Sequence, residues 1–277
     1  MRHPTILPNE PATVRLRLGQ RSVEYRLRRS TRSTGLRVTI DPRLGLVVSV
    51  PPAARRGWAH PVERIDAFLR ARESWVLRHL DRLERERDSA RALGGPRDGG
   101  QVLYRGVLHR IRVRAGVLAG RRSTVERAGS ESEDELIVSV AAGERRPIQR
   151  ILAAWLRERA TEAIDAAVAG HAAALRVNPA KVDIRDPRSR WGSASREGRL
   201  MFSWRLVLAP PASLETVVVH ELAHLRIFGH GPAFWALMAS RSPSHLADRA
   251  WLRRHAHALH TALDPVEEPD EAGLMAR

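Results

Sequence analysis

Apolar and polar residues alternate along the N-terminal part of the chain. Between residues 12 and 50, the segments TVRLRL, VEYRLRR, LRVTI and LVVSV carry apolar residues at every second position. This period of two predicts strands that bury one face. Turns are expected near Gly19 and Pro42, and Pro51 ends the last segment because proline cannot donate to a strand ladder. We therefore expect a group of short antiparallel strands.

Helical periodicity appears twice in the chain. Residues 58–87 place apolar side chains at three- and four-residue steps, which predicts one long amphipathic helix. A second stripe of this kind follows Pro147 and reaches Leu175, and proline suits the first turn of a helix. Between the two stripes, VLYRGVLHRIRVR and LIVSV return to alternation. They predict further strands, the first of them bent or folded into a hairpin at Gly106.

The C-terminal part mixes both patterns. Residues 181–186 and 199–209 are expected to form strands on either side of a polar turn. A helix follows, with Ser213 as its candidate cap and Gly229 as its expected end. The pattern predicts an α+β fold: a strand-rich segment with a helix over residues 1–100, a domain over 101–261, and an acidic flexible tail over 262–277.

The segment HELAHLRIFGH, residues 220–230, carries the candidate chemistry. On a helix, His220 and His224 lie one turn apart on the same face, so two imidazoles can converge on one metal ion. Glu221 is rotated by about 100° around the helix and flanks that site. Its carboxylate can therefore activate a water molecule rather than bind the metal.

The neighbouring residues favour a metal site over a helix that carries histidines by chance. The helix is apolar around nearly its whole circumference, and burying imidazoles and a carboxylate without partners is costly. His230 follows as a third candidate ligand, and the absence of cysteine leaves His, Asp and Glu as the ligand types. Three imidazoles favour Zn²⁺, and nickel, cobalt and iron stay open as alternatives. The histidine spacing equals that of metzincins, but Ile227 occupies their glycine position, and we reject that assignment.

Composition limits the classes of protein that remain. The chain has 277 residues, of which 43% are apolar, so it can bury a substantial core. No apolar stretch is long enough to span a membrane and the N-terminus lacks the apolar region of a signal peptide, so we expect a soluble, cytoplasmic protein. The net charge of +16, almost all from arginine, favours polyanions such as nucleotides or nucleic acid. A compositional bias spread over the surface is the stronger interpretation of that charge.

The segments RDPRSRWGSAS and LMFSWRLVLAPPASLETVVVHELAHLRIFGHGPAFWALM resemble the YgjP-like metallopeptidase family, which is related to the SprT-like and WLM zinc peptidases. The resemblance implies a zincin-like, minimal gluzincin-type domain in which a small sheet packs on the H-E-x-x-H helix. Residues 199–209 would supply the edge strand that lies along this helix. Ala194 stands where the family usually has cysteine, and Ser203 and Gly229 stand where asparagine is common.

Carried over by position, the resemblance makes Glu221 the catalytic base. The implied zinc ligands are His220, His224 and His230, and the implied substrate-binding residues are Arg190, Trp191 and Ser193.

The leading hypothesis is a zinc-dependent metallopeptidase that acts on a peptide or protein substrate. Three alternatives remain open. One is a metal-dependent phosphohydrolase acting on nucleotides, and another is a nucleic-acid-associated protease of the SprT-like kind. The third is a metal-stabilised fold without catalytic activity.

Overall fold

A computed structural model describes residues 12–118, 122–129, 134–187 and 190–264. The chain divides into two compact units, Met1–Ser89 and Ala90–Arg277. Each unit has its own cluster of buried apolar side chains, and each contains both helices and strands. The α+β class expected from the sequence is confirmed.

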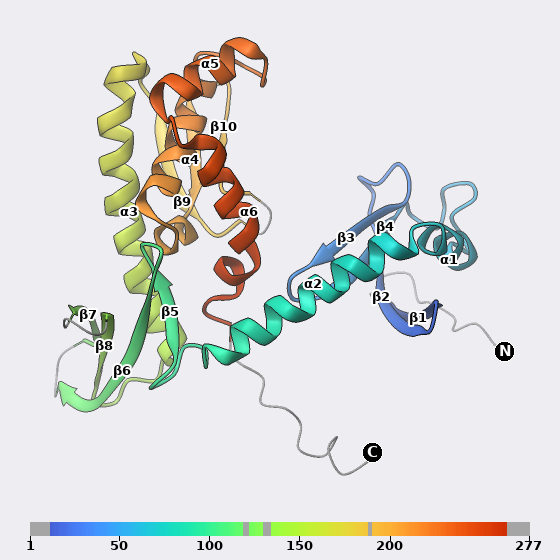
Figure 1. Cartoon of the computed structure of the whole chain (residues 1–277), viewed down its shortest axis with the longest axis horizontal. Coiled ribbons are helices and arrows are strands. Elements are labelled where there is room, and N and C mark those ends of the chain that lie inside the picture. Colours follow the sequence, from blue (N-terminus) through green and yellow to red (C-terminus); the bar gives the residue numbers. More distant parts are fainter. Residues whose placement is uncertain (1–11, 119–121, 130–133, 188–189, 265–277) are drawn as a thin grey trace. The chain divides into compact units, whose positions relative to one another are not determined.

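The first unit contains a four-stranded sheet. Its strands are β1 (Ala12–Leu18), β2 (Arg21–Arg29), β3 (Arg37–Asp41) and β4 (Gly45–Val50), in the order β1-β2-β4-β3 (Figure 1). The β1–β2 and β3–β4 pairs are antiparallel, as expected. However, β2 and β4 run parallel. Strand β4 inserts between β2 and β3, the strand with which β4 forms a hairpin. The sheet is therefore mixed.

The prediction of a single helix over residues 58–87 is wrong. The structure has two helices, α1 (Val62–Arg70) and α2 (Glu73–Ala92). The buried stripe of α1 consists of Ile65 and Leu69, and the next positions of that stripe are the polar residues Arg72 and Glu73. Ending α1 before this polar pair lets α2 begin in a new register, which buries Val76.

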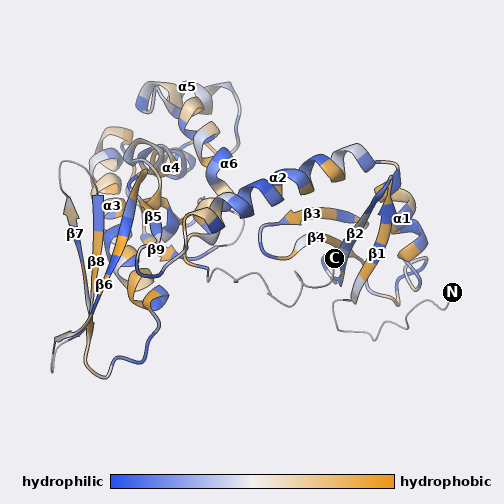
Figure 2. Cartoon of the chain, turned by 60° about the horizontal axis from the view of Figure 1, so that its bottom comes forward, coloured by the Kyte–Doolittle hydropathy of each residue, from blue (hydrophilic) through white to orange (hydrophobic). Residues whose placement is uncertain are grey.

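The second unit begins with a sheet built in the same way. Its strands are β5 (Gln101–Tyr104), β6 (Val107–Leu118), β7 (Thr124–Gly129) and β8 (Asp134–Ala141), in the order β5-β6-β8-β7. Arg105 and Gly106 turn the β5–β6 hairpin with φ angles of 52° and 81°, which confirms the hairpin expected at Gly106. Figure 2 shows hydrophobic and hydrophilic residues alternating along β6. Helix α3 (Ile148–Leu175) starts directly after Pro147, as predicted.

A three-stranded sheet follows, with β9 (Lys181–Arg185), β10 (Gly192–Ala194) and β11 (Arg199–Ser203) in the order β10-β11-β9. The strand expected over residues 199–209 is too long, because Trp204–Leu208 form a 3₁₀ helix, η1. Ser203 Oγ accepts the N–H of Arg205 and starts the η1 turn. All five η1 residues are buried, and the Arg205 guanidinium donates to Asp186 at 2.8 Å.

The position of β11 corrects the expected layout of this sheet. Residues 199–203 form the central strand, paired with β10 on one side and with β9 on the other. The edge strand beside the histidine-bearing helix is β10, within a segment that was expected to be a polar turn. With only three residues, β10 is too short to show an alternating pattern in the sequence.

Three helices complete the second unit: α4 (Pro211–His224), α5 (Pro232–Arg241) and α6 (His245–Thr261). Helix α4 lies between α3 and α6 (Figure 1). It ends at His224, five residues before the expected stop at Gly229. Ser213 does not cap α4, because Pro210 is its N-cap and the Ser213 hydroxyl donates to Asp248 at 3.1 Å.

Two further expectations concern the membrane and the acidic tail. Among the residues that the structure describes, no helix combines the length and apolar character needed to cross a membrane. Nearly all of the acidic tail lies outside the described residues, since these end at 264.

Candidate metal centre

Three imidazoles converge at the C-terminal end of α4. His220 and His224 are one helical turn apart, and their Nε2 atoms lie 3.2 Å from each other. His230 follows in the loop before α5, where Gly229 adopts a φ of 94° that favours glycine, and its Nε2 lies 3.2 Å from that of His220. The structure therefore brings together all three histidines that the sequence singled out.

This arrangement fits a tetrahedral metal ion. Zinc-to-nitrogen bonds of about 2.0–2.1 Å at a tetrahedral angle separate two ligand nitrogens by about 3.3–3.4 Å. The separation of 3.2 Å, found for both His220–His224 and His220–His230, is close to that value. The Nδ1 of His224 lies 3.2 Å from the carbonyl oxygen of Ile227 and can donate to it. That hydrogen bond leaves the Nε2 lone pair of His224 available to a metal.

Burial favours the neutral forms of His220 and His224, which metal binding requires. The pKa of His220 falls to about 3, mainly because burial disfavours its charged form, with smaller contributions from the charges of His224, His230 and Arg249. Burial also lowers the pKa of His224. A proton therefore does not compete with a metal for the Nε2 of His220 at neutral pH.

Glu221 is 7% exposed and lies beside β10. Burial raises the pKa of its carboxyl to about 7, and the positive charge of Arg190 opposes that rise. A Cβ atom built on Gly192 would lie 2.7 Å from both Cγ and Oε1 of Glu221. Only glycine therefore allows the strand to approach this side chain so closely, and the sequence alone did not reveal that contact.

One edge of β10 faces away from its partner strand. The carbonyl oxygen of Trp191 accepts from Ser203, and the N–H of Ser195 donates to Arg199, so alternate residues bond to β11. In an antiparallel ladder the residues between them direct their N–H and C=O groups outward. These outward residues are Gly192 and Ala194, on the strand that borders Glu221.

Two aromatic residues of α5 support the histidines. Phe234 is fully buried, and its ring centroid lies 4.6–5.0 Å from the rings of all three histidines. The Trp235 ring stacks on that of His230, with the centroids 5.6 Å apart. In the sequence, helical spacing beside Leu237 and Met238 predicts core positions for this pair and no role at the site. The sequence feature that indicates their contact with the site is their position four and five residues after His230, in the first turn of a helix.

The three expected substrate-binding residues lie on or next to β10. Arg190 is exposed and acts electrostatically on Glu221. Trp191 stacks on His260 of α6, with the ring centroids 4.7 Å apart, and packs against the core. Ser193 pairs with Met201, and strand alternation directs its side chain to the face opposite the one that Gly192 presents to Glu221. A substrate role for these residues stays a prediction.

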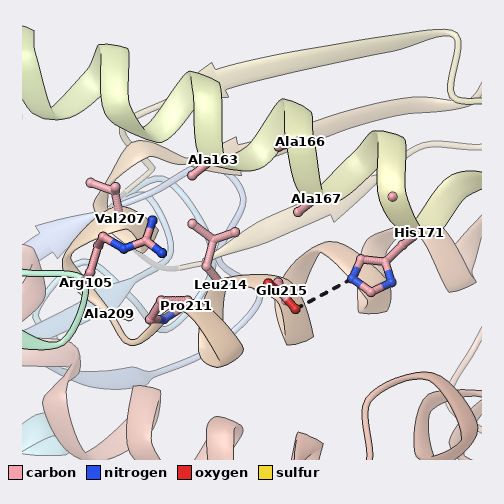
Figure 3. Close-up of a pocket in the computed structure, with 11 residues that line it drawn as sticks. Arg105, Ala163, Ala166, Ala167, His171, Val207, Ala209, Pro211, Leu214 and Glu215 are labelled. Atoms are coloured by element: carbon pink, nitrogen blue, oxygen red, sulfur yellow. Dashed lines mark ion pairs between the residues drawn. The ribbon is translucent and has the colours of Figure 1, made fainter.

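A separate cavity of about 400 Å³ lies near the other end of α4. Figure 3 shows small side chains of α3 forming one wall, with Arg105 near one end and the ion pair of His171 and Glu215 near the other. His171 Nε2 and Glu215 Oε2 are 3.8 Å apart. None of the three clustered histidines lines this cavity. In the sequence His171 lies near the apolar stripe that follows Pro147, which predicts a packed histidine, and its partial burial and contact with Glu215 agree with that prediction.

Comparison with known families identifies the family of this chain. The YgjP-like metallopeptidase domain matches residues 34–255, which include strands β3 and β4 of the first unit's sheet and the whole histidine cluster. Neither the curated proteins nor the solved structures yielded a match. Because the matched segment covers well over half of the 277 residues, the chain belongs to the YgjP-like metallopeptidase family.

Proposed function

We propose that this protein is a zinc-dependent peptidase in which His220, His224 and His230 hold the metal and Glu221 is the general base. The observation that carries the proposal is the convergence of three Nε2 atoms beside a buried carboxylate. Family membership supports a metallopeptidase in general. The choice of zinc rests on three nitrogen donors without a thiolate, and on ligand separations near those of a tetrahedral site.

The bound metal would supply Lewis-acid chemistry, polarising the scissile carbonyl and lowering the pKa of a water molecule. Glu221 takes a proton from the attacking water and passes it to the departing amine. Burial raises the pKa of this carboxyl to about 7 against the opposing charge of Arg190, and a group with such a pKa can do both at neutral pH. Phe234 excludes water from beneath the imidazoles and holds their rings in place.

The free edge of β10 supports a peptide substrate. An extended peptide can pair with the outward N–H and C=O groups of Gly192 and Ala194, as a further strand of the sheet. Such pairing holds the peptide main chain next to Glu221, because Gly192 contacts that side chain. Main-chain pairing is independent of the peptide sequence, so specificity must come from side chains around β10 and the histidines.

The first experiment measures metal content by plasma mass spectrometry on untagged wild type, on His224→Ala and on Glu221→Gln. We expect a single zinc ion per chain in wild type and in Glu221→Gln, and none in His224→Ala. Hydrolysis of a quenched fluorogenic peptide pool should require both the metal and Glu221. A folded wild-type protein that neither contains zinc nor takes it up would overturn the proposal.

A further inference from the structure

Three arginines, Arg196, Arg249 and Arg190, lie next to β10 or the aromatic residues around the histidines. The first, Arg196, lies in the turn that follows β10, and its Cζ is 5.8 Å from the ring centroid of Phe228. Phe228 belongs to the loop that carries His230, and 58% of its surface is exposed. The turn after β10 and the ligand-bearing loop therefore meet at a pair formed by a guanidinium and an aromatic ring.

Arg249 approaches the site from α6. Its Cζ lies 4.7 Å from the ring centroid of Trp235, which stacks on His230. Its positive charge also contributes to the lowered pKa of His220. A second guanidinium is thus held against the aromatic support of the histidine cluster.

Arg190 occupies the other end of β10, two residues before Gly192. The three-residue strand spans about 10 Å. A peptide paired along its free edge would pass Arg190 at one end and Arg196 at the other, so side chains on both sides of the cleaved bond would meet a guanidinium.

Few carboxylates neutralise these arginines. Among the described residues, no carboxylate forms an ion pair with Arg190, Arg196 or Arg249. The acidic groups that act on them are Glu221 itself and Glu197, which is also hydrogen-bonded to Ser195.

Two other acidic residues in this part of the unit are engaged elsewhere. Asp186 pairs with Arg205, and buried Asp248 accepts from Ser213 and Thr216. The surroundings of β10 and the histidines therefore carry an excess of positive charge.

We propose that the site selects acidic peptides, with Arg190, Arg196 and Arg249 binding Asp or Glu side chains on either side of the cleaved bond. This inference rests on the proposed peptidase function. A peptide is favoured over a nucleic acid because β10 offers main-chain pairing groups between the arginines, and only a polypeptide complements them. Each exposed ion pair contributes about twofold in affinity and at most about fivefold, so three together give a preference of about tenfold.

The test compares two quenched fluorogenic peptide pools, one with Asp or Glu at every third position and one with Asn or Gln there. The zinc-loaded wild type is assayed beside the Arg190→Gln, Arg196→Gln, Arg249→Gln triple variant. Arg145→Gln, an exposed arginine in the loop before α3, is the matched control. We expect kcat/KM to favour the acidic pool by about tenfold in wild type and in the control, and the preference to vanish in the triple variant. Raising the ionic strength from about 0.05 M to about 0.5 M should weaken the preference.

Equal cleavage of the two pools, or a preference that survives in the triple variant, would overturn the inference. If neither pool is cleaved, the proposed peptidase function fails, and fluorescence anisotropy of the intact pools on wild type still decides the acidic preference. Stronger binding of the acidic pool would support the inference, and equal binding would overturn it. Tighter binding of a single-stranded DNA oligonucleotide of equal charge would assign the arginines to nucleic acid and overturn it as well.

Discussion

The two four-stranded sheets share one design and differ in what they support. The strand orders β1-β2-β4-β3 and β5-β6-β8-β7 correspond position by position. In each sheet the first two strands form an antiparallel hairpin, and the second strand pairs in parallel with the fourth. The fourth strand also pairs antiparallel with the third, which lies at the edge. Even the inner strands read alike, LVVSV in β4 and LIVSV in β8. The same fold unit therefore occurs twice in this chain.

The helices that follow the two sheets are not alike. Helix α2 spans 20 residues and buries only Val76 and Leu83, so most of its surface is polar. Helix α3 buries seven residues along 28, and it contacts β7 and β8 as well as α4 and η1. A helix that is apolar on more than one face can hold another layer. That second face of α3 is what positions α4, and with it the histidines.

The largest expected effect tests whether the chemistry belongs to the second unit alone. Glu221→Gln should lower kcat by about 10²–10⁴-fold, because the general base is lost while the neighbouring histidines are unchanged. Zinc content and thermal unfolding should stay as in wild type. Peptide hydrolysis by Glu63→Gln, which changes an exposed carboxylate of α1, provides the control and should be unaffected. Full activity of Glu221→Gln would place the base elsewhere.

A matched pair of core substitutions tests the independence of the units. Leu46 of β4 and Leu136 of β8 hold equivalent positions and are 1% and 0% exposed. Replacing either by alanine should lower the unfolding free energy of its own unit by about 2–5 kcal/mol, through lost burial and a residual cavity. Denaturant unfolding followed by tryptophan fluorescence measures both transitions. Only Leu136→Ala should reduce zinc retention on mild heating. One shared transition, shifted equally by both variants, would contradict the division into units.

A glycine in each unit provides a smaller and more local test. Gly192→Ala should destabilise the second unit by about 1–3 kcal/mol, because the new methyl group overlaps Glu221. Gly35→Ala is the matched control, since a Cβ there meets no atom within 4 Å. In a Glu221→Ala background the cost at Gly192 should largely disappear, and thermal unfolding of the four variants measures this coupling. An equal cost in both backgrounds would mean that Glu221 is not the obstacle.

Local patterns in the sequence predicted the parts of this fold that depend on local interactions. The start of α3 after Pro147 and the hairpin at Gly106 follow from the conformational preferences of single residues. The convergence of His220 and His224 follows from helix periodicity. His230 joins them as the sequence led us to expect, although α4 ends earlier than expected and the loop at Gly229 brings it back.

The remaining features depend on contacts between distant segments. Strands β2 and β4 pair in parallel because β4, and not β3, lies next to β2 in the sheet. No short sequence pattern determines which of these two strands takes that place. Residues 204–208 are apolar enough for a strand, yet burial of Arg205 against Asp186 favours the 3₁₀ turn. Gly192 has no requirement for a left-handed backbone, so its importance arises only from the approach of Glu221.

The smallest predicted effect concerns the stability of the second unit in acid. It arises in the loop after β8 and has no counterpart in the equivalent loop after β4. After β4, the Arg29 guanidinium donates to the carbonyl oxygens of Pro51 and Trp58, which do not titrate. After β8, Glu144 accepts from Ser123 and Arg146, and hydrogen bonds from Arg146 are the main reason that its pKa falls from 4.5 to about 2.

A lowered folded-state pKa means that the stabilisation is complete above about pH 4.5 and is lost as the pH falls towards about 2. Glu144→Gln should therefore flatten the pH dependence of the second unit's unfolding in that window, as measured by denaturant titration at several pH values. The first unit's transition should not change, and a flattening seen equally in both units would show that the effect does not come from this loop.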